Sequence, residues 1–177
     1  MDAIATTYAQ ALFQLSLDDK KEDQIFDEIK LINECFNENK EILKIFETRE
    51  LNLEDKKGIL DNIFKDTISH DTFNFLRLLI DKRRINYILE MSKEFKRMYY
   101  EYKNIKEAII YSATALDKDQ VDAIKLALEN KYESKFVISN AIDESLIGGV
   151  KIMIEDIVID GSIANKLKKL KSSIIAK

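Results

Sequence analysis

The 177-residue sequence has no proline, four glycines, one histidine and one cysteine. Without proline, and with so little glycine, few loops can depend on special backbone angles, which favours long helices joined by short polar connections. The single cysteine, Cys35, excludes an intramolecular disulfide and a cysteine-cluster metal site. No apolar run approaches the roughly 20 residues that a membrane-spanning helix needs, and the first residues lack the pattern of a secretory signal. We therefore expect a cytoplasmic protein that touches a membrane only through partners.

Signals for enzyme chemistry are also missing. Gly58 stands alone, and Gly148-Gly149 is not followed by Lys-Ser or Lys-Thr, so there is no phosphate-binding loop of the usual kind. His70 sits beside an expected helix start, where an exposed first-turn residue is favoured over a general base. Cys35 ends an amphipathic helix, where a free cysteine usually behaves as a small buried hydrophobe. We expect no catalytic residue, no cofactor and no metal site.

The charges nearly balance, with 28 Lys and Arg against 32 Asp and Glu. Two basic clusters stand out, Lys82-Arg83-Arg84 and the group of Lys166, Lys168, Lys169 and Lys171. Nucleic-acid binding would draw on such clusters, but the chain is acidic overall and lacks an aromatic ribonucleoprotein motif. Solvated helix faces are the favoured interpretation, and we expect no nucleic-acid partner.

The first part of the chain carries a helical period almost without a break. Asn52 followed by Asp55 resembles an N-cap signal, and Ser69 can cap a helix over residues 70–81. A further helix is expected from about Arg84. Six helices in residues 1–104 predict a compact helical bundle. The first two apolar stripes, spaced at i, i+4, i+7 and i+11, consist of Ile4, Tyr8, Ala11 and Leu15, and of Ile25, Ile29, Ile32 and Phe36.

Near Lys103 the period changes from helical to extended. Asp117 with Gln120 predicts the start of a helix between strands, and Glu155-Asp156 predicts a tight turn. Residues 105–177 are therefore expected to form a small α/β domain, which makes the fold α+β and mainly helical. The expected strands are 108–113, 136–138, 150–154 and 157–159, and the expected last helix carries Ile163, Leu167, Leu170 and Ile174 on one side.

Two helices have more apolar surface than one core contact requires. In residues 72–80, Phe73, Leu76 and Ile80 share one side, while Phe75, Leu78 and Leu79 cover another. The first helix carries Ala5, Ala9 and Leu12 beside its apolar stripe. Either both helices are central in the bundle, or they form a groove for an amphipathic helix of a partner. The residue pattern leaves both alternatives open.

Two glycine-containing motifs are expected to shape the backbone. In Asp160-Gly161-Ser162, Gly161 permits a strand-to-helix turn and Ser162 can cap the following helix. Asp160 is favourable near a helix N-terminus. Gly148 and Gly149 precede a strand and are expected to serve the same purpose of backbone geometry.

Three segments in order resemble one family. Tyr8-Ala9-Gln10-Ala11-Leu12-Phe13 resembles the Tyr-Ala-x-Ala-Leu-Phe element of delta subunits of bacterial F-type ATP synthases, relatives of the mitochondrial oligomycin-sensitivity-conferring protein. Residues 74–80 followed by Arg84-Ile85 resemble the central element of that family. Residues 146–150 together with 160–163 resemble its C-terminal signature.

The resemblance implies a non-catalytic connector in the peripheral stalk, on the cytoplasmic face of the inner membrane. It implies that the N-terminal bundle binds the N-terminal helix of an alpha subunit and that the C-terminal domain binds the C-terminal region of the b subunits. By match, Tyr8, Ala11 and Leu78 are the expected groove residues, and Phe75 is added from the helical-face argument. The alternative is a helical-bundle adaptor that binds another amphipathic peptide.

Overall fold

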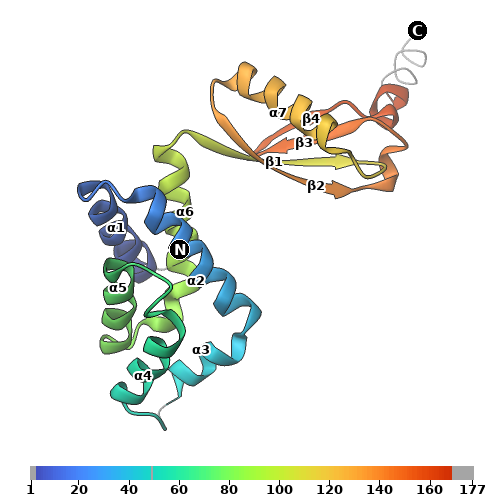
Figure 1. Ribbon diagram of the computed structural model, residues 1–177. Coiled ribbons are helices and arrows are strands. Elements are labelled where there is room, and N and C mark those ends of the chain that lie inside the picture. Colours follow the sequence, from blue (N-terminus) through green and yellow to red (C-terminus); the bar gives the residue numbers. More distant parts are fainter. Residues whose placement is uncertain (1–2, 49, 169–177) are drawn as a thin grey trace. The chain divides into compact units, whose positions relative to one another are not determined.

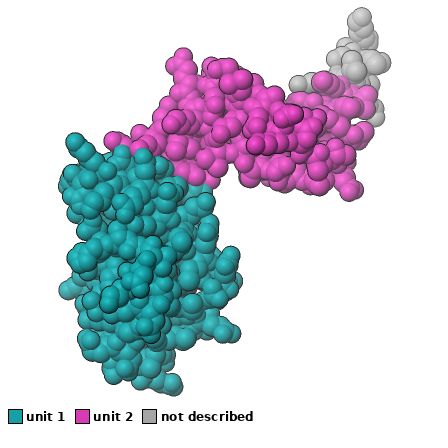
Figure 2. Space-filling view, viewed as in Figure 1, with its two compact units in different colours: residues 1–99 teal, residues 100–177 magenta. Residues whose placement is uncertain are grey.

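The computed structural model describes residues 3–48 and 50–168. The chain divides into two compact units, residues 1–99 (unit 1) and residues 100–177 (unit 2), which Figure 2 shows in different colours. Unit 1 is helical, and unit 2 combines a helix with a four-stranded sheet. The predicted class, a mainly helical α+β fold with a six-helix bundle before a small α/β domain, is confirmed.

Six α-helices, α1 to α6, precede the sheet, as the sequence predicts (Figure 1). A short 3₁₀ helix, η1, precedes the last of them, so α6 begins a few residues after Arg84. The helix α6 also extends from unit 1 into unit 2. The bounds are α1 Ala3–Asp18, α2 Glu22–Glu38, α3 Lys40–Glu47, α4 Leu53–Phe64, α5 His70–Asp81, η1 Ile85–Tyr87 and α6 Ile88–Tyr102.

The helix starts follow the predicted capping residues. Asn52 accepts a hydrogen bond from the backbone N–H of Asp55 over 2.8 Å, which satisfies one of the free donors at the start of α4. Ser69 accepts from the N–H of Thr72 at the start of α5. Both N-cap predictions are confirmed.

The core of unit 1 is built on the predicted apolar stripe of α2. Ile25, Ile29, Ile32 and Phe36 are all buried. The ring of Phe36 lies 5.8 Å from the ring of Phe64 on α4 and 6.2 Å from that of Phe46 on α3, measured between centroids. Aromatic rings at such distances combine large buried area with favourable edge contacts. Helices α2, α3 and α4 are therefore joined around one aromatic cluster.

Unit 2 has the strand order β2-β1-β3-β4. Strands β1 and β2 run parallel and are connected by α7, while β3 pairs antiparallel with β1 and with β4. The first two strands are longer than predicted, because backbone pairing with each other extends them beyond the apolar residues that mark them in the sequence. The bounds are β1 Ile105–Ser112, α7 Lys118–Tyr132, β2 Lys135–Ile142, the 3₁₀ turn η2 Glu144–Leu146, β3 Val150–Ile154 and β4 Ile157–Asp160.

Helix α7 covers one face of the sheet (Figure 1). Its start is the predicted one, a capping box in which Asp117 and Gln120 each accept from the other's backbone N–H. The core between α7 and the sheet consists of Ala108, Ile110, Leu128, Phe136, Ile152 and Ile154. Residues 163–168 are helical, and Ile163 and Leu167 are exposed there. The predicted continuation through Lys169, Leu170, Lys171 and Ile174 lies outside the described residues.

Candidate functional site: the α1–α5 face

Helices α1 and α5 of unit 1 are in contact through the rings of Tyr8 and Phe75, which meet edge to face with centroids 6.5 Å apart. Around this contact the two helices present apolar side chains on their outer sides. We call this surface the α1–α5 face and define it by Tyr8, Ala11, Leu15, Phe75 and Leu78.

Helix α1 uses only one of its two apolar arcs for the core. Ala5, Ala9 and Leu12 are buried, so the core contact is made by the residues beside the predicted apolar stripe. On the predicted stripe, Ala11 is exposed and Leu15 is 42% exposed. The small side chains of Ala5 and Ala9 allow α1 to approach its neighbours closely, and Leu12 is buried on the same side.

Helix α5 is buried on most of its circumference. Phe73, Leu76, Leu79 and Ile80 are in the core, and Phe75 is only 9% exposed. Among the apolar side chains of α5, Leu78 is the exception, at 43% exposure. Of the four residues predicted for the groove, Ala11 and Leu78 are therefore exposed, Tyr8 is half-buried and Phe75 supports the surface from below.

The start of α5 is fixed by a carboxylate from α2. Glu28 accepts hydrogen bonds from the backbone N–H of Ser69 over 2.9 Å and from the Ser69 hydroxyl over 2.8 Å, and also from the Thr72 hydroxyl. Burial alone would raise the pKa of Glu28, but hydrogen bonds from Thr72, Gln24 and Ser69 outweigh it and hold that pKa below its ordinary value. A negative charge at a helix N-terminus is also stabilised by the helix dipole.

Two ion pairs fix α5 to its neighbours. Lys21, just before α2, contacts Asp71 over 2.7 Å, and Lys57 of α4 contacts Asp81 over 2.8 Å. The hydrogen bond that Lys21 donates to Asp71 raises the pKa of Lys21, and the one that Lys57 donates to Asp81 raises the pKa of Lys57. One pair lies at each end of α5, so the helix that carries Leu78 is held at both ends. The sequence argument missed Glu28 and Lys21, because neither signals a contact with a residue more than 40 positions away.

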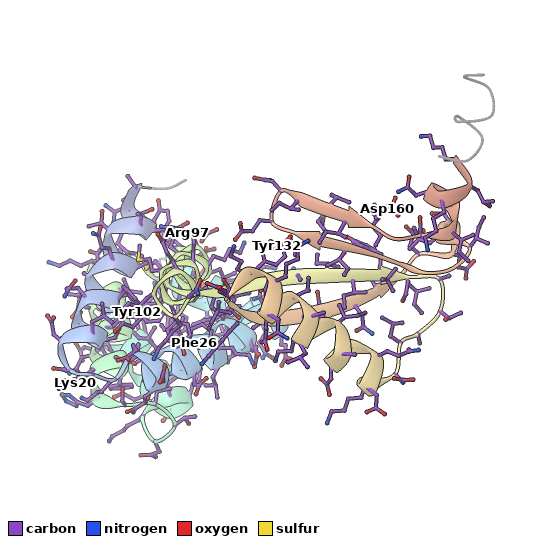
Figure 3. All side chains as sticks on the ribbon, turned by 90° about the horizontal axis from the view of Figure 1, so that it is seen from above. Lys20, Phe26, Arg97, Tyr102, Tyr132 and Asp160 are labelled. Carbon is purple, nitrogen blue, oxygen red and sulfur yellow. The ribbon has the colours of Figure 1, made fainter. Side chains whose placement is uncertain are left out.

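The two predicted glycine motifs of unit 2 meet in space. The N–H of Gly161 donates to the carbonyl oxygen of Val150 over 2.9 Å, and the N–H of Ile163 donates to that of Gly148 over 3.0 Å. Asp160 lies at the end of β4 (Figure 3), where its carboxylate accepts from the N–H of Ser162. The Ser162 hydroxyl accepts from the N–H of Asn165 over 3.1 Å. The motifs therefore shape one connection between β3, β4 and the helical residues 163–168.

A separate cavity of about 950 Å³ lies in unit 1 between the α3–α4 connection and η1. Its wall includes Glu47, Glu54, Arg83 and Lys56, and none of the four residues predicted for the groove. The ammonium of Lys56 donates to the carbonyl oxygens of Phe46 and Thr48, 2.6 Å from each. This lysine thus closes the end of α3, where a cation interacts favourably with the helix dipole.

The side chains that could take part in chemistry, those of the histidine and the cysteine, do not come together in one site. His70 is exposed, and its ring contacts the amide of Asn74 on the next turn. Cys35 is half-buried. Its burial, and to a smaller extent the negative charge of Glu38, raise the pKa of its thiol and so disfavour the reactive thiolate. Over residues 3–48 and 50–168, no group of three His, Cys, Asp or Glu could hold a metal ion. No helix within those ranges is long and apolar enough to cross a membrane.

Comparison with known proteins agrees with the three sequence elements. The ATP synthase subunit delta of Alkalihalophilus pseudofirmus is 33% identical over 175 residues, which cover 98% of this chain and 96% of that protein. The protein of the same name in Desulfitobacterium hafniense is 36% identical over 172 residues, covering 97% and 96%. The Mycoplasma mobile subunit delta is 35% identical over 170 residues, covering 96% and 94%.

The fold is also known from a solved structure. A chain of the mitochondrial ATP synthase hexamer of Toxoplasma gondii superposes with a TM-score of 0.73 over 99% of both chains, at 16% identity. A family model described as the ATP synthase delta (OSCP) subunit matches residues 4–174. With this match and the three relatives above 30% identity, the chain belongs to the ATP synthase delta (OSCP) subunit family.

Proposed function

We propose that the chain works as a non-catalytic connector of the peripheral stalk, with a different partner on each unit. Its family places it in ATP synthase as a peripheral-stalk subunit. In our proposal unit 1 binds the N-terminal helix of an alpha subunit, and unit 2 binds the C-terminal region of the b subunits. The protein is then held at the cytoplasmic face of the inner membrane through these partners.

The proposal that unit 1 binds the alpha subunit rests on one observation: apolar residues are exposed on helices that already have a buried side. Ala11, Leu15 and Leu78 remain accessible, although Ala5, Ala9 and Leu12 on α1 and Leu76 and Leu79 on α5 supply the core contacts. An amphipathic helix can lay its apolar side on such a surface, with side chains spaced at i, i+3, i+4 and i+7 as anchors. A contact of this kind buries on the order of 1,000 Å² or more in total.

Binding of the b subunits by unit 2 would explain the role of the connector. A protein attached to the catalytic alpha/beta head at one unit and to the b subunits at the other prevents the head from turning with the rotor. Proton-driven rotation can then be used for ATP synthesis. No chemistry on this chain is required for that role.

The experiment is calorimetry with the full chain and a peptide that matches the alpha N-terminus from the same source. Leu78→Asp places a charge in the α1–α5 face and should weaken binding by more than about 1 kcal/mol. Leu31→Asp is the matched control, because Leu31 is 41% exposed on α2 and lies outside the face. Its affinity should equal that of the parent.

Two results would reject the proposal. Equal affinity for a folded Leu78→Asp variant and the parent would mean that the alpha peptide does not bind at the α1–α5 face. A parent chain that does not bind the alpha peptide, while it captures an unrelated amphipathic helix, would favour the alternative adaptor. Circular dichroism of both variants is needed, because loss of the helical signal in Leu78→Asp would show that Leu78 is required for folding.

A further inference from the structure

Ile147, which follows η2, has a backbone conformation that isoleucine rarely adopts. Its φ is +63° and its ψ is −33°. Even the small left-handed region open to other residues, with ψ of about +30° to +60°, does not include these angles. Among the residues that the structure describes, six besides glycine have a positive φ, and Ile147 is the only β-branched one. A β-branched side chain makes such a conformation strained, although glycine, which avoids the strain, stands at the next two positions.

The neighbours of Ile147 hold this conformation without using its side chain. Leu146 before it is buried. Gly148 after it accepts a hydrogen bond at its carbonyl oxygen from the N–H of Ile163 over 3.0 Å. The side chain of Ile147 is 68% exposed, the highest value among the large apolar side chains of the described residues. Backbone strain of this kind gathers at binding sites, and here it presents an apolar side chain that contributes little to the core of unit 2.

Two more exposed apolar side chains lie close to Ile147. Ile163 and Leu167 belong to the helical residues 163–168, which follow β4 at one end of the sheet (Figure 1), and both are exposed. Their spacing of four residues places them on one side of that helix. The Ile163 side chain reaches Gly148, since a Cβ atom added to this glycine would lie 2.8 Å from Cδ1 of Ile163. Ile163 therefore links the other two residues, and we call Ile147, Ile163 and Leu167 the Ile147 patch.

The charges beside the Ile147 patch are positive. Lys166 and Lys168 stand on either side of Leu167 in the sequence, and both are exposed. Neither lysine forms an ion pair with a carboxylate of the residues that the structure describes. Their charges are therefore available to a partner, and charge complementarity around an apolar contact selects which partner binds. The patch fits an amphipathic helix that carries Asp or Glu beside its apolar stripe.

We propose that the Ile147 patch is the docking site of such an acidic amphipathic helix, with Ile147 as its anchor. The inference rests on the proposed function, under which the partner of unit 2 is the C-terminal region of a b subunit. It adds the place of contact and the chemistry of the segment that binds there. The apolar stripe of the helix contacts Ile147, Ile163 and Leu167, and its acidic residues lie opposite Lys166 and Lys168. The strained backbone holds the Ile147 side chain outward before the partner arrives, which lowers the ordering cost of binding.

The test is calorimetry of the full chain with a peptide that matches the C-terminal region of a b subunit from the same source. Ile147→Gly removes the anchor and should weaken binding at least about five-fold. The same substitution relieves the strain at a positive φ, so the variant should unfold at a temperature equal to that of the parent or higher. A residue with only a structural role would not combine weaker binding with unchanged or greater stability.

Two further variants test the rest of the surface. Leu167→Ala should also weaken binding. Leu126→Ala is its matched control, because Leu126 of α7 lies outside the patch and is 60% exposed against 54% for Leu167. Its affinity should equal that of the parent. Lys166→Glu/Lys168→Glu should weaken binding about five-fold or more at low salt, and the loss should shrink as salt screens the repulsion.

The outcomes separate this inference from the proposed function. A b peptide that binds the parent and the patch variants equally would reject the Ile147 patch as the docking site, while the connector role would stand. A parent that does not bind the b peptide would reject both. Binding that depends on Ile147 and Leu167 but not on the lysine charges would reject an acidic helix as the occupant. If Ile147→Gly unfolds at a lower temperature than the parent, the side chain serves the fold of unit 2 and is not held out for a partner.

Discussion

A Cβ atom added to Gly149 would lie 2.7 Å from the carbonyl oxygen of Gly161, closer than real Cβ contacts allow. Gly149 also has a φ of +75°, in the left-handed region that favours glycine. Gly161 follows β4 directly, and its own N–H is bonded to Val150. The two segments that resemble the C-terminal signature of the family are therefore one structural unit, in which each segment restricts the side chains of the other.

Gly149→Ala should destabilise unit 2 by about 1–3 kcal/mol, because the new methyl group meets backbone and the residue is held at a positive φ. Gly58→Ala is the control. Gly58 lies inside α4 with open space around its Cβ position, so this substitution should stabilise unit 1 by roughly 0.5–1 kcal/mol. Thermal and urea unfolding measure both effects. Equal stability of Gly149→Ala and the parent would contradict the close packing.

Ser162→Ala should cost about 1 kcal/mol, because the N–H of Asn165 loses its acceptor at the start of the helical residues 163–168. Thr114→Ala, in an exposed connection, should stay within about 0.5 kcal/mol of the parent. Urea unfolding of both variants makes the comparison. If the two behave alike, the Ser162 hydroxyl does not act as a helix cap.

The features that the sequence predicted well are the local ones. Asn52, Ser69 and the pair Asp117 and Gln120 each act on donors within three residues, so their effect can be inferred from sequence spacing. The contact between Glu28 and Ser69 spans 41 positions, and no local pattern distinguishes Glu28 from the other acidic residues of α2. Its role depends on how α2 and α5 pack.

Residue periodicity also left the orientation of α1 undecided. Both arcs of α1 are apolar, and the one with small residues, Ala5 and Ala9, is the buried one. Which arc is buried depends on how α1 packs against the neighbouring helices, and the residue period of α1 alone does not contain that information. Periodicity also did not separate Leu78 from Leu79, which lies beside it and is fully buried; the family resemblance was the signal for Leu78.

Glu28→Gln should destabilise unit 1 at neutral pH, because the charged carboxylate at the start of α5 is lost while its size is kept. The pKa of Glu28 is lowered in the folded protein, so its charge stabilises the fold above the unfolded-state pKa. That contribution disappears as the pH falls through the folded-state pKa. The gap between parent and variant should therefore be largest at neutral pH and shrink in acid.

Thermal unfolding from neutral to acidic pH measures that gap. Glu34→Gln provides the control, because Glu34 is an exposed residue of α2 whose nearest cation, Lys30, is 3.9 Å away. Surface pairs of this kind contribute little, so its stability should follow the parent at every pH. A Glu28→Gln variant with a gap independent of pH would contradict the lowered pKa.

The last prediction concerns coupling between the two units. Each unit has its own core, with Phe36, Phe64 and Leu76 in unit 1 and Phe136 and Ile110 in unit 2. Deletion of the residues after Asn104 removes the whole sheet and keeps all six helices of the bundle. Separately folded units retain their own binding sites, so the truncated chain should bind the alpha peptide as the parent does and should not bind b subunits.

In membranes where this truncated chain is the only copy, the head should still hydrolyse ATP, because nothing catalytic has been removed. Hydrolysis and synthesis should be poorly coupled to proton movement, since the head is no longer held against the torque of the rotor. Proton pumping measured beside ATP hydrolysis gives the coupling directly, and vesicles with the full chain provide the control. Full coupling with the truncated chain would mean that the torque is resisted along a route outside unit 2, and the connector proposal would then fail.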